Sequence, residues 1–199
     1  MRVVAGKYKG YNLKSPKVSN SRPTDNKVKE AIFAMLYPLK DQASALDLFS
    51  CTGQMGIEFL SRGADFVVFN ELNFKNYGIL KENLAKIGNS NTKTYKKDFR
   101  KCLETLKDKN MTFDYIFLDP PYKDDYIYTS LKLILKYDLL RKEGIIITES
   151  DRNLDFSDEF NLEIIKEKSY GRKVVKFYKT IWKQYTLVAL ILWLSDIWI

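Results

Sequence analysis

The stretch Ala45-Leu46-Asp47-Leu48-Phe49-Ser50-Cys51-Thr52-Gly53-Gln54-Met55-Gly56 has the pattern of a short strand, a tight loop and the first turn of a helix. Small residues in the loop allow the backbone to approach a ligand closely, and free N–H groups at the helix N-terminus point toward that ligand. Two glycines in such a turn are common, so the stretch alone is a weak signal. It gains weight because the same strand-to-helix rhythm continues along the chain.

Apolar strands are expected at residues 45–49, 66–69, 115–118 and 145–148, a weaker strand at 92–95, and helices at 55–62, 73–87, 99–107 and 127–136. Strands that are apolar throughout and alternate with helices indicate an α/β fold with a mostly parallel sheet covered on both faces. Residues 162–169 and 173–178, separated by Tyr170-Gly171-Arg172, predict an antiparallel hairpin added at the edge of that sheet.

Two segments flank this unit. Residues 1–40 predict a small extension, in which a hairpin of 2–5 and 11–13 precedes a helix that begins after Thr24 or Asp25 and ends before Pro38. Residues 41–179 form the main domain, and 180–199 form an apolar tail. The run 187–194 is far short of the roughly 20 residues that span a bilayer. We expect it to be a terminal element packed on the body or sequence beyond the domain, with a membrane-surface or partner contact as the alternative.

The composition narrows the chemistry. The 199 residues contain two cysteines, in no metal-ligand spacing, and no histidine, which excludes His-based acid–base catalysis and argues against a disulfide framework. The net charge of +8 favours a polyanionic partner, and the basic excess is concentrated in residues 1–40, although a solvated basic face is the alternative. The chain opens without an apolar segment typical of a signal peptide, so a cytoplasmic location is expected.

Acidic residues follow four successive predicted strands: Asp47, Glu71, Asp98 and Asp119. In open parallel sheets, ligands bind beyond the carboxyl ends of the strands. An acid 24 positions after Asp47 is placed to accept hydrogen bonds from ribose hydroxyls, and Asp98 to meet an adenine amino group. Each acid alone could be a solvated loop residue, whereas four in register predict a nucleoside-binding edge.

The last of these acids belongs to Asp119-Pro120-Pro121-Tyr122, directly after the strand-like run Phe113-Asp114-Tyr115-Ile116-Phe117-Leu118. The two prolines fix the backbone angle φ and have no N–H groups, so the backbone of this turn offers carbonyl acceptors. Asp119 adds carboxylate acceptors and Tyr122 a stacking surface. A strand that ends in a proline turn is the plain alternative. The functional interpretation is a grip on a flat group that carries an amino nitrogen.

Taken together, these features resemble the class I S-adenosylmethionine-dependent methyltransferases, and in particular the bacterial small-subunit rRNA guanine-N2 methyltransferase family of the RsmD type. The resemblance extends over about residues 1–178. Its motifs are Arg2-Val3-Val4-Ala5-Gly6-Lys7-Tyr8-Lys9-Gly10, Ser21-Arg22-Pro23-Thr24, Val28-Lys29-Glu30-Ala31, Gly56-Ile57-Glu58, Leu60-Ser61-Arg62-Gly63-Ala64, Lys81-Glu82-Asn83-Leu84 and Phe117-Leu118-Asp119-Pro120-Pro121-Tyr122.

The resemblance implies a Rossmann-like fold with a seven-stranded sheet, S-adenosylmethionine as the cofactor, and 16S rRNA in a partly assembled small ribosomal subunit as the partner. An activated methyl donor of this kind needs no metal. A monomer is our default expectation, and no membrane span is expected from the length of the apolar run. The implied catalytic residues are Asp119, Pro120 and Tyr122. The implied cofactor-binding residues are Asp47, Phe49, Ser50, Cys51, Gly53, Gly56, Glu71, Leu72, Asp98, Phe99 and Asp119. The candidate RNA-binding residues are Arg2, Lys7, Arg22, Thr24 and Lys27.

Two positions depart from the family pattern. Cys51 stands where a glycine is usual, and because a Cβ atom disfavours positive φ we expect weaker cofactor affinity. Asn70 stands where an apolar residue is usual. Two alternatives stay open: an amino-methyltransferase that acts on DNA adenine or cytosine or on a protein amide, and a non-catalytic RNA-binding relative. The first would usually need a target-recognition segment, for which we find no room.

Overall fold

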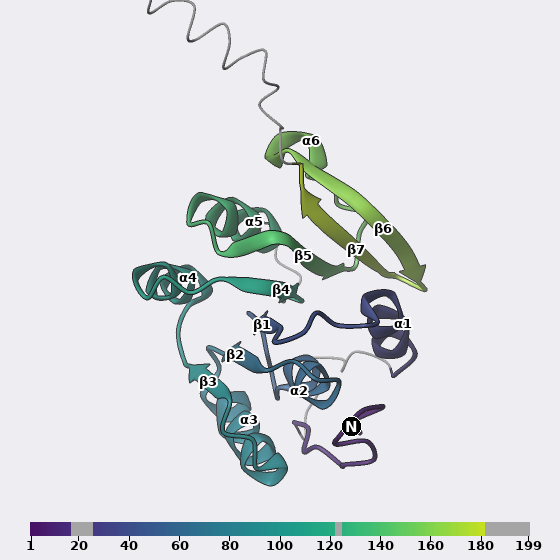
Figure 1. The fold of residues 1–199 in the computed structure, drawn as a ribbon, viewed down its shortest axis with the longest axis vertical. Helices are drawn as coiled ribbons and strands as arrows, with labels where there is room; N and C mark the ends of the chain where they lie inside the picture. The colour runs from purple at the N-terminus through teal and green to yellow at the C-terminus, as the bar shows by residue number, and fades with distance from the viewer. Residues whose placement is uncertain (17–25, 122–124, 182–199) are drawn as a thin grey trace, which may run out of the picture.

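A computed structural model describes residues 1–16, 26–121 and 125–181 (Figure 1). The helices are α1 (Asn26–Leu36), α2 (Gln54–Ser61), α3 (Phe74–Ile87), α4 (Phe99–Asp108), α5 (Tyr126–Lys136) and α6 (Ser157–Phe160). The strands are β1 (Ser44–Asp47), β2 (Phe66–Asn70), β3 (Thr92–Tyr95), β4 (Phe113–Leu118), β5 (Leu140–Ser150), β6 (Leu162–Tyr170) and β7 (Lys173–Thr180). The predicted alternation of strands and helices is confirmed.

The seven strands form one sheet in the order β3-β2-β1-β4-β5-β7-β6. The pairs between β3 and β5 are parallel, and β7 pairs antiparallel with both β5 and β6. The chain order reverses between β1 and β4, which is where α/β sheets of this type bind ligands. The predicted mostly parallel sheet with an antiparallel edge hairpin is confirmed.

Helices cover both faces of the sheet, with α1 and α2 on one side and α4 and α5 on the other (Figure 1). One buried cluster joins the N-terminal segment and α1 to α2, α3 and one face of the strands; its members include Val3, Leu13, Ile32 and Phe59. A second cluster packs α4 and α5 on the opposite face. Strands buried on both sides explain why the sequence shows apolar runs instead of alternation.

The N-terminal hairpin is smaller than predicted. Backbone hydrogen bonds join residues 1–3 to residues 10–13, but only Arg2 and Asn12 form a β-bridge. The N–H groups of Val4 and Ala5 donate instead to the Glu58 carboxylate of α2, at 3.0 and 3.1 Å. The ladder therefore stops where the segment docks on the helix.

Four predictions fall outside the described residues: the N-cap at Thr24 or Asp25, the RNA-binding candidates Arg22 and Thr24, the Tyr122 ring and the apolar run 187–194. In the parts of the chain that the structure does describe, no helix combines the length and the apolar character needed to cross a bilayer.

Candidate active site

The four acids lie at the carboxyl ends of four strands that are neighbours in the sheet, β3, β2, β1 and β4. Asp47 is the last residue of β1, and Asp119 directly follows β4. Glu71 directly follows β2, while Asp98 lies three positions beyond Tyr95, the end of β3. The fold thus brings the predicted nucleoside-binding acids to one edge.

The loop between β1 and α2 is held by short polar contacts. Ser50 Oγ donates to the Asp47 carbonyl at 2.6 Å, and the Gly56 N–H donates to Asp47 Oδ2 at 2.9 Å. Asp47 is almost completely buried, and burial raises its pKa to about 7; the Gly56 N–H opposes this shift and Glu71 adds to it. Asp47 therefore fastens the N-terminus of α2 to β1 from beneath the loop.

Gly53 and Gly56 have no room for a side chain. A Cβ atom at Gly53, where φ is 87°, would lie 2.4 Å from Leu80 Cδ1, and one at Gly56 would lie 2.1 Å from Phe69 Cε1. The glycines were predicted for close approach of a ligand, yet protein neighbours already require them. They let α2 pack closely on β2 and α3.

Glu71 and Cys51 are joined across the loop. The Cys51 N–H donates to Glu71 Oε2 at 2.9 Å, and the Asn73 N–H donates to Oε1 at 2.6 Å. Burial raises the pKa of Glu71, and the two N–H donors oppose the shift. Cys51 has φ of 49°, in the left-handed region that its Cβ disfavours. The family's usual glycine at this position therefore has a conformational explanation.

Asn70 connects three loops at the carboxyl edge. Its side-chain amide donates to the carbonyls of Leu48 and Lys97, at 3.2 and 3.1 Å, and accepts from the Lys97 N–H at 3.3 Å. The Asn70 carbonyl accepts from the Ser50 N–H at 2.9 Å, and the Asn70 N–H donates to Ser50 Oγ at 3.0 Å. Sequence reasoning noted Asn70 only as a departure, because its partners are 20 to 27 residues away.

Aromatic rings line the edge beyond β1 and β3. Phe99 is buried, with ring centroids 5.2 Å from Phe49 and 5.0 Å from Tyr126. Asp98 caps α4 by accepting from the Arg100 N–H at 2.9 Å. Tyr126 was not predicted, because nothing in its local sequence places the start of α5 against Phe49.

Leu72, on the far side of Glu71, is 61% exposed and has its apolar surface open at the same edge. The arrangement offers apolar surface beside hydrogen-bond acceptors, and this combination suits a nucleoside.

Asp119 lies in a group of charges that sequence reasoning missed in part. Burial raises the pKa of Asp119 well above its usual range; Glu149 raises it further, Lys173 lowers it and Asp47 raises it. Glu149 is completely buried and forms an ion pair with Lys173 of β7. Glu149 and Lys173 come from β5 and β7, so only the topology reveals that they lie near Asp119.

No hydrogen bond from the described residues reaches the Asp119 carboxylate, whereas Asp47 and Glu71 are each bound by backbone N–H groups. Asp119 therefore retains its acceptor capacity for a ligand. Pro120 is buried and Pro121 is exposed beside it.

Within the described residues, no group of three or more His, Cys, Asp or Glu side chains is arranged to hold a metal ion.

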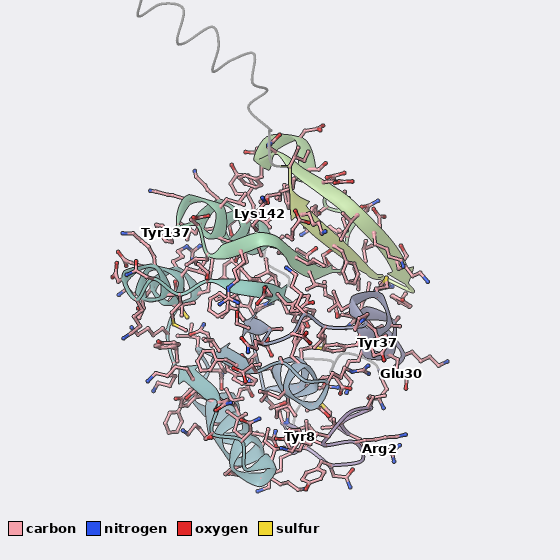
Figure 2. All side chains as sticks on the ribbon, in the orientation of Figure 1. Arg2, Tyr8, Glu30, Tyr37, Tyr137 and Lys142 are labelled. Carbon is pink, nitrogen blue, oxygen red and sulfur yellow. The ribbon has the colours of Figure 1, made fainter. Side chains whose placement is uncertain are left out.

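Two of the candidate RNA-binding residues, Arg2 and Lys7, lie on the N-terminal segment, away from this edge. Arg2, Lys7 and Lys27 are exposed, and Figure 2 shows Arg2 pointing outward from the N-terminal segment. The Lys7 N–H donates to the carbonyl of Ser61, the last residue of α2, at 2.6 Å. Eight helical residues span about 12 Å, so Lys7 lies roughly one helix length from the loop that begins α2. Arg22 and Thr24 lie outside the described residues.

The docking of the N-terminal segment accounts for several sequence motifs. The Glu58 carboxylate accepts hydrogen bonds from the N–H groups of Val4 and Ala5. It also forms an ion pair with Lys29 at 3.7 Å, and both side chains of this pair are fully buried. A Cβ atom at Gly6 would lie 1.8 Å from the Ser61 carbonyl oxygen. Lys29 is thus one of the basic residues counted in the N-terminal excess that cannot contact RNA.

Asn83, from another of the motifs, ties the N-terminal segment to the carboxyl edge. Its side chain accepts from the Lys14 N–H at 2.8 Å and donates to the Lys14 and Thr52 carbonyls at 3.1 and 2.9 Å. The segment therefore runs along α2 from Ser61 to the loop that holds Cys51, and it is fastened at both ends.

Comparisons with known proteins agree with this geometry. The sequence model of the family described as Conserved hypothetical protein 95 matches residues 1–179. The Bacillus subtilis protein YlbH is 36% identical over 181 residues, covering 90% of this chain and 98% of its own. Ribosomal RNA small subunit methyltransferase D of Haemophilus influenzae is 30% identical, covering 90% and 93%. The structure of Escherichia coli YhhF superimposes with a TM-score of 0.80 at 26% identity, covering 90% and 97%.

Proposed function

This chain belongs to the family described as Conserved hypothetical protein 95, of the RsmD type, and from that premise we propose that it transfers a methyl group from S-adenosylmethionine to the exocyclic N2 of a guanine in small-subunit rRNA. The observation that carries the proposal is the Asp119-Pro120-Pro121 turn, which follows the central strand β4 beside a nucleoside-binding edge. The relatives named Ribosomal RNA small subunit methyltransferase D support RNA of the small subunit as the substrate.

The carboxyl edge fits the cofactor. Glu71 keeps acceptor capacity beyond its two N–H partners, because a carboxylate has about four lone-pair sites, and it can accept from ribose hydroxyls. Phe49 and Leu72 supply apolar surface for the adenine ring. When bound, S-adenosylmethionine supplies a methyl group that its sulfonium already activates, so the residues here need to orient and not to activate.

The acceptor nitrogen is the difficult partner, because the guanine N2 lone pair is delocalised into the ring. Asp119 and the Pro120 carbonyl can accept its two N–H groups, which draws the lone pair out of conjugation and stabilises the positive charge that develops. A guanine in a folded RNA must leave its stack to reach this turn. We infer that Tyr122 provides the replacement stacking surface, and that Arg2, Lys7, Arg22, Thr24 and Lys27 contact phosphates.

The decisive experiment is methyl transfer from labelled S-adenosylmethionine to small-subunit rRNA that lacks the modification, assembled with ribosomal proteins and then digested to nucleosides. Label in N2-methylguanosine supports the proposal. Label in N6-methyladenosine or N4-methylcytidine keeps the mechanism and overturns the substrate. No label together with no cofactor binding leaves the non-catalytic alternative.

A pair of variants tests the grip on the amino group. Asp119→Ala should lower transfer at least about hundredfold, because one preorganised acceptor at the transition state is lost, while cofactor affinity stays largely intact. Asp108→Ala is the control, since Asp108 is an exposed carboxylate at the opposite end of α4. Near-normal turnover of Asp119→Ala would remove Asp119 from the mechanism.

A further inference from the structure

An ion pair between buried Glu149 and half-buried Lys173 lies close enough to Asp119 to act on its charge. β4 and β5 are parallel and in register at Leu118 and Thr148, so Asp119 and Glu149 are the next residues on adjacent strands. Glu149 has no exposed surface, and its Oε1 atom is bound by the Nζ atom of Lys173 on β7. The strand register therefore holds two carboxylates and one ammonium group at the point where β4, β5 and β7 end or begin.

One oxygen of this cluster has no partner. Among the described residues, four buried side-chain oxygens lack a hydrogen bond, and Glu149 Oε2 is the only one that belongs to a charged group. A buried polar atom without a partner is unfavourable and calls for a functional explanation. Lys173 binds the other oxygen of this carboxylate, Oε1, and the charge of Glu149 acts on Asp119.

We propose that Glu149 and Lys173 are positioning residues that prepare Asp119 to take the proton released by the acceptor nitrogen during methyl transfer. This inference rests on the proposed function and extends it. It accounts for the Asp119 carboxylate, which accepts no hydrogen bond from the described residues, for the second carboxylate that acts on it and for the lysine that pairs with Glu149.

The step balances without a further reactant. The acceptor nitrogen forms the new N–C bond, and the methyl–sulfur bond breaks with its electron pair remaining on sulfur. The nitrogen then carries a positive charge and loses an N–H proton to an Asp119 oxygen. The proton received there passes to solvent when the product leaves.

The charges around Asp119 have the signs that this role needs. Burial, Glu149 and Asp47 all raise the pKa of Asp119, and only Lys173 lowers it. A raised pKa makes the ionised carboxylate a better proton acceptor, and a general base is most effective when its pKa lies near the working pH.

The test combines carboxyl titration of the ligand-free protein with a pH profile of transfer. In protein labelled with ¹³C at the aspartate carboxyl carbons, Asp119 is assigned by comparison with Asp119→Asn. Glu149→Gln keeps the side-chain size and removes the charge that raises the pKa of Asp119. We expect the Asp119 titration and the acid limb of kcat/KM both to move to lower pH.

Two further variants complete the design. Glu167→Gln is the matched control, because Glu167 pairs with Lys176 at 3.2 Å on the same hairpin, and it should leave both curves unchanged. Lys173→Gln removes the opposing charge, so the acid limb should move to higher pH. Since that variant applies the same test with the opposite sign, it decides the question if Glu149→Gln does not fold.

The outcomes separate the inference from the proposed function. If the wild-type protein methylates guanine and Glu149→Gln lowers the rate by one factor at every pH, with the Asp119 titration unmoved, the inference is wrong and the function stands. If no variant or wild-type protein methylates guanine, the proposed function fails, and the titration still shows whether Glu149 controls Asp119.

Discussion

Replacement of Asn70 by alanine tests whether one buried amide holds the carboxyl edge together. The substitution removes three side-chain hydrogen bonds, with heavy-atom distances of 3.1, 3.2 and 3.3 Å, and leaves the Leu48 and Lys97 carbonyls without this donor. At roughly 1 kcal/mol for each bond, and less for the longest, the free energy of unfolding should fall by about 2 to 3 kcal/mol. For a domain of this size, Tm should fall by roughly 5 to 10 °C.

The same substitution should weaken cofactor binding. The loop after β1, which begins at Leu48, and the loop after β3, which contains Lys97, carry predicted cofactor contacts. Both loops must be ordered for the cofactor to bind. If about 1.4 kcal/mol of the lost hydrogen-bond energy is needed for that ordering, the cofactor affinity falls about tenfold. Thermal unfolding and calorimetric titration with S-adenosylmethionine measure the two effects separately.

Asp114→Ala is the control, because it should lower the stability of the fold without disordering the loops at the carboxyl edge. Asp114 accepts from the Ser44 N–H and Oγ and from Arg141 Nη1, at 2.9, 3.2 and 2.7 Å, at the amino end of the same sheet. It should lower Tm by at least as much and leave cofactor affinity intact. Equal losses of affinity in the two variants would show that the effect comes from general destabilisation. An unchanged Tm for Asn70→Ala would refute the hydrogen-bond argument itself.

Three further predictions concern the same edge and the basic segment. Cys51→Gly should change the free energy of unfolding by less than about 1 kcal/mol, because relief of the left-handed strain is offset by the flexibility of glycine in the unfolded chain. Cys51→Val should clearly lower Tm in thermal unfolding, and an unchanged Tm for this variant would contradict the observed φ. The folded-state pKa of Asp47, raised to about 7, means that ionisation costs stability as pH rises from about 4, its unfolded value, to about 7. Asp47→Asn should therefore raise Tm at pH 7 and above and have little effect near pH 4, and an equal change at both would contradict burial as the cause. Arg2→Glu with Lys7→Glu should lower RNA affinity and reduce its dependence on salt, and an unchanged salt slope in filter binding would exclude these two as phosphate contacts.

The sequence predicted the fold well because local patterns carry it. Strands buried on both faces leave uninterrupted apolar runs, and glycines or caps mark the helix ends, as Asn73 and Gly88 do for α3. The N-terminal hairpin was predicted as longer than it is. Its backbone donors are taken by Glu58, a residue of α2 that no local pattern connects to Val4.

The site was predictable where it follows one strand and hidden where it crosses strands. Asp47, Glu71 and Asp119 each stand directly at a strand end, so the alternation of strands and helices located them. Glu149 is the last residue but one of β5, and its role depends on Lys173, which reaches it only because β7 lies antiparallel beside β5. The partners of Asn70 are likewise fixed by the order of β2, β1 and β3.

Three acids of the edge, Asp47, Glu71 and Asp119, differ in what they are bound to, and this difference assigns their roles. Asp47 accepts from Gly56, and Glu71 accepts from Cys51 and Asn73, so backbone N–H groups satisfy both carboxylates while they hold loops in place. No described residue donates to Asp119, although burial and Glu149 make its ionised form the more costly. A carboxylate kept unsatisfied in such surroundings is stabilised most by a donor that arrives with the substrate. An amino group that gains positive charge during the reaction is such a donor, which makes Asp119 the residue at this edge that responds most to the chemistry.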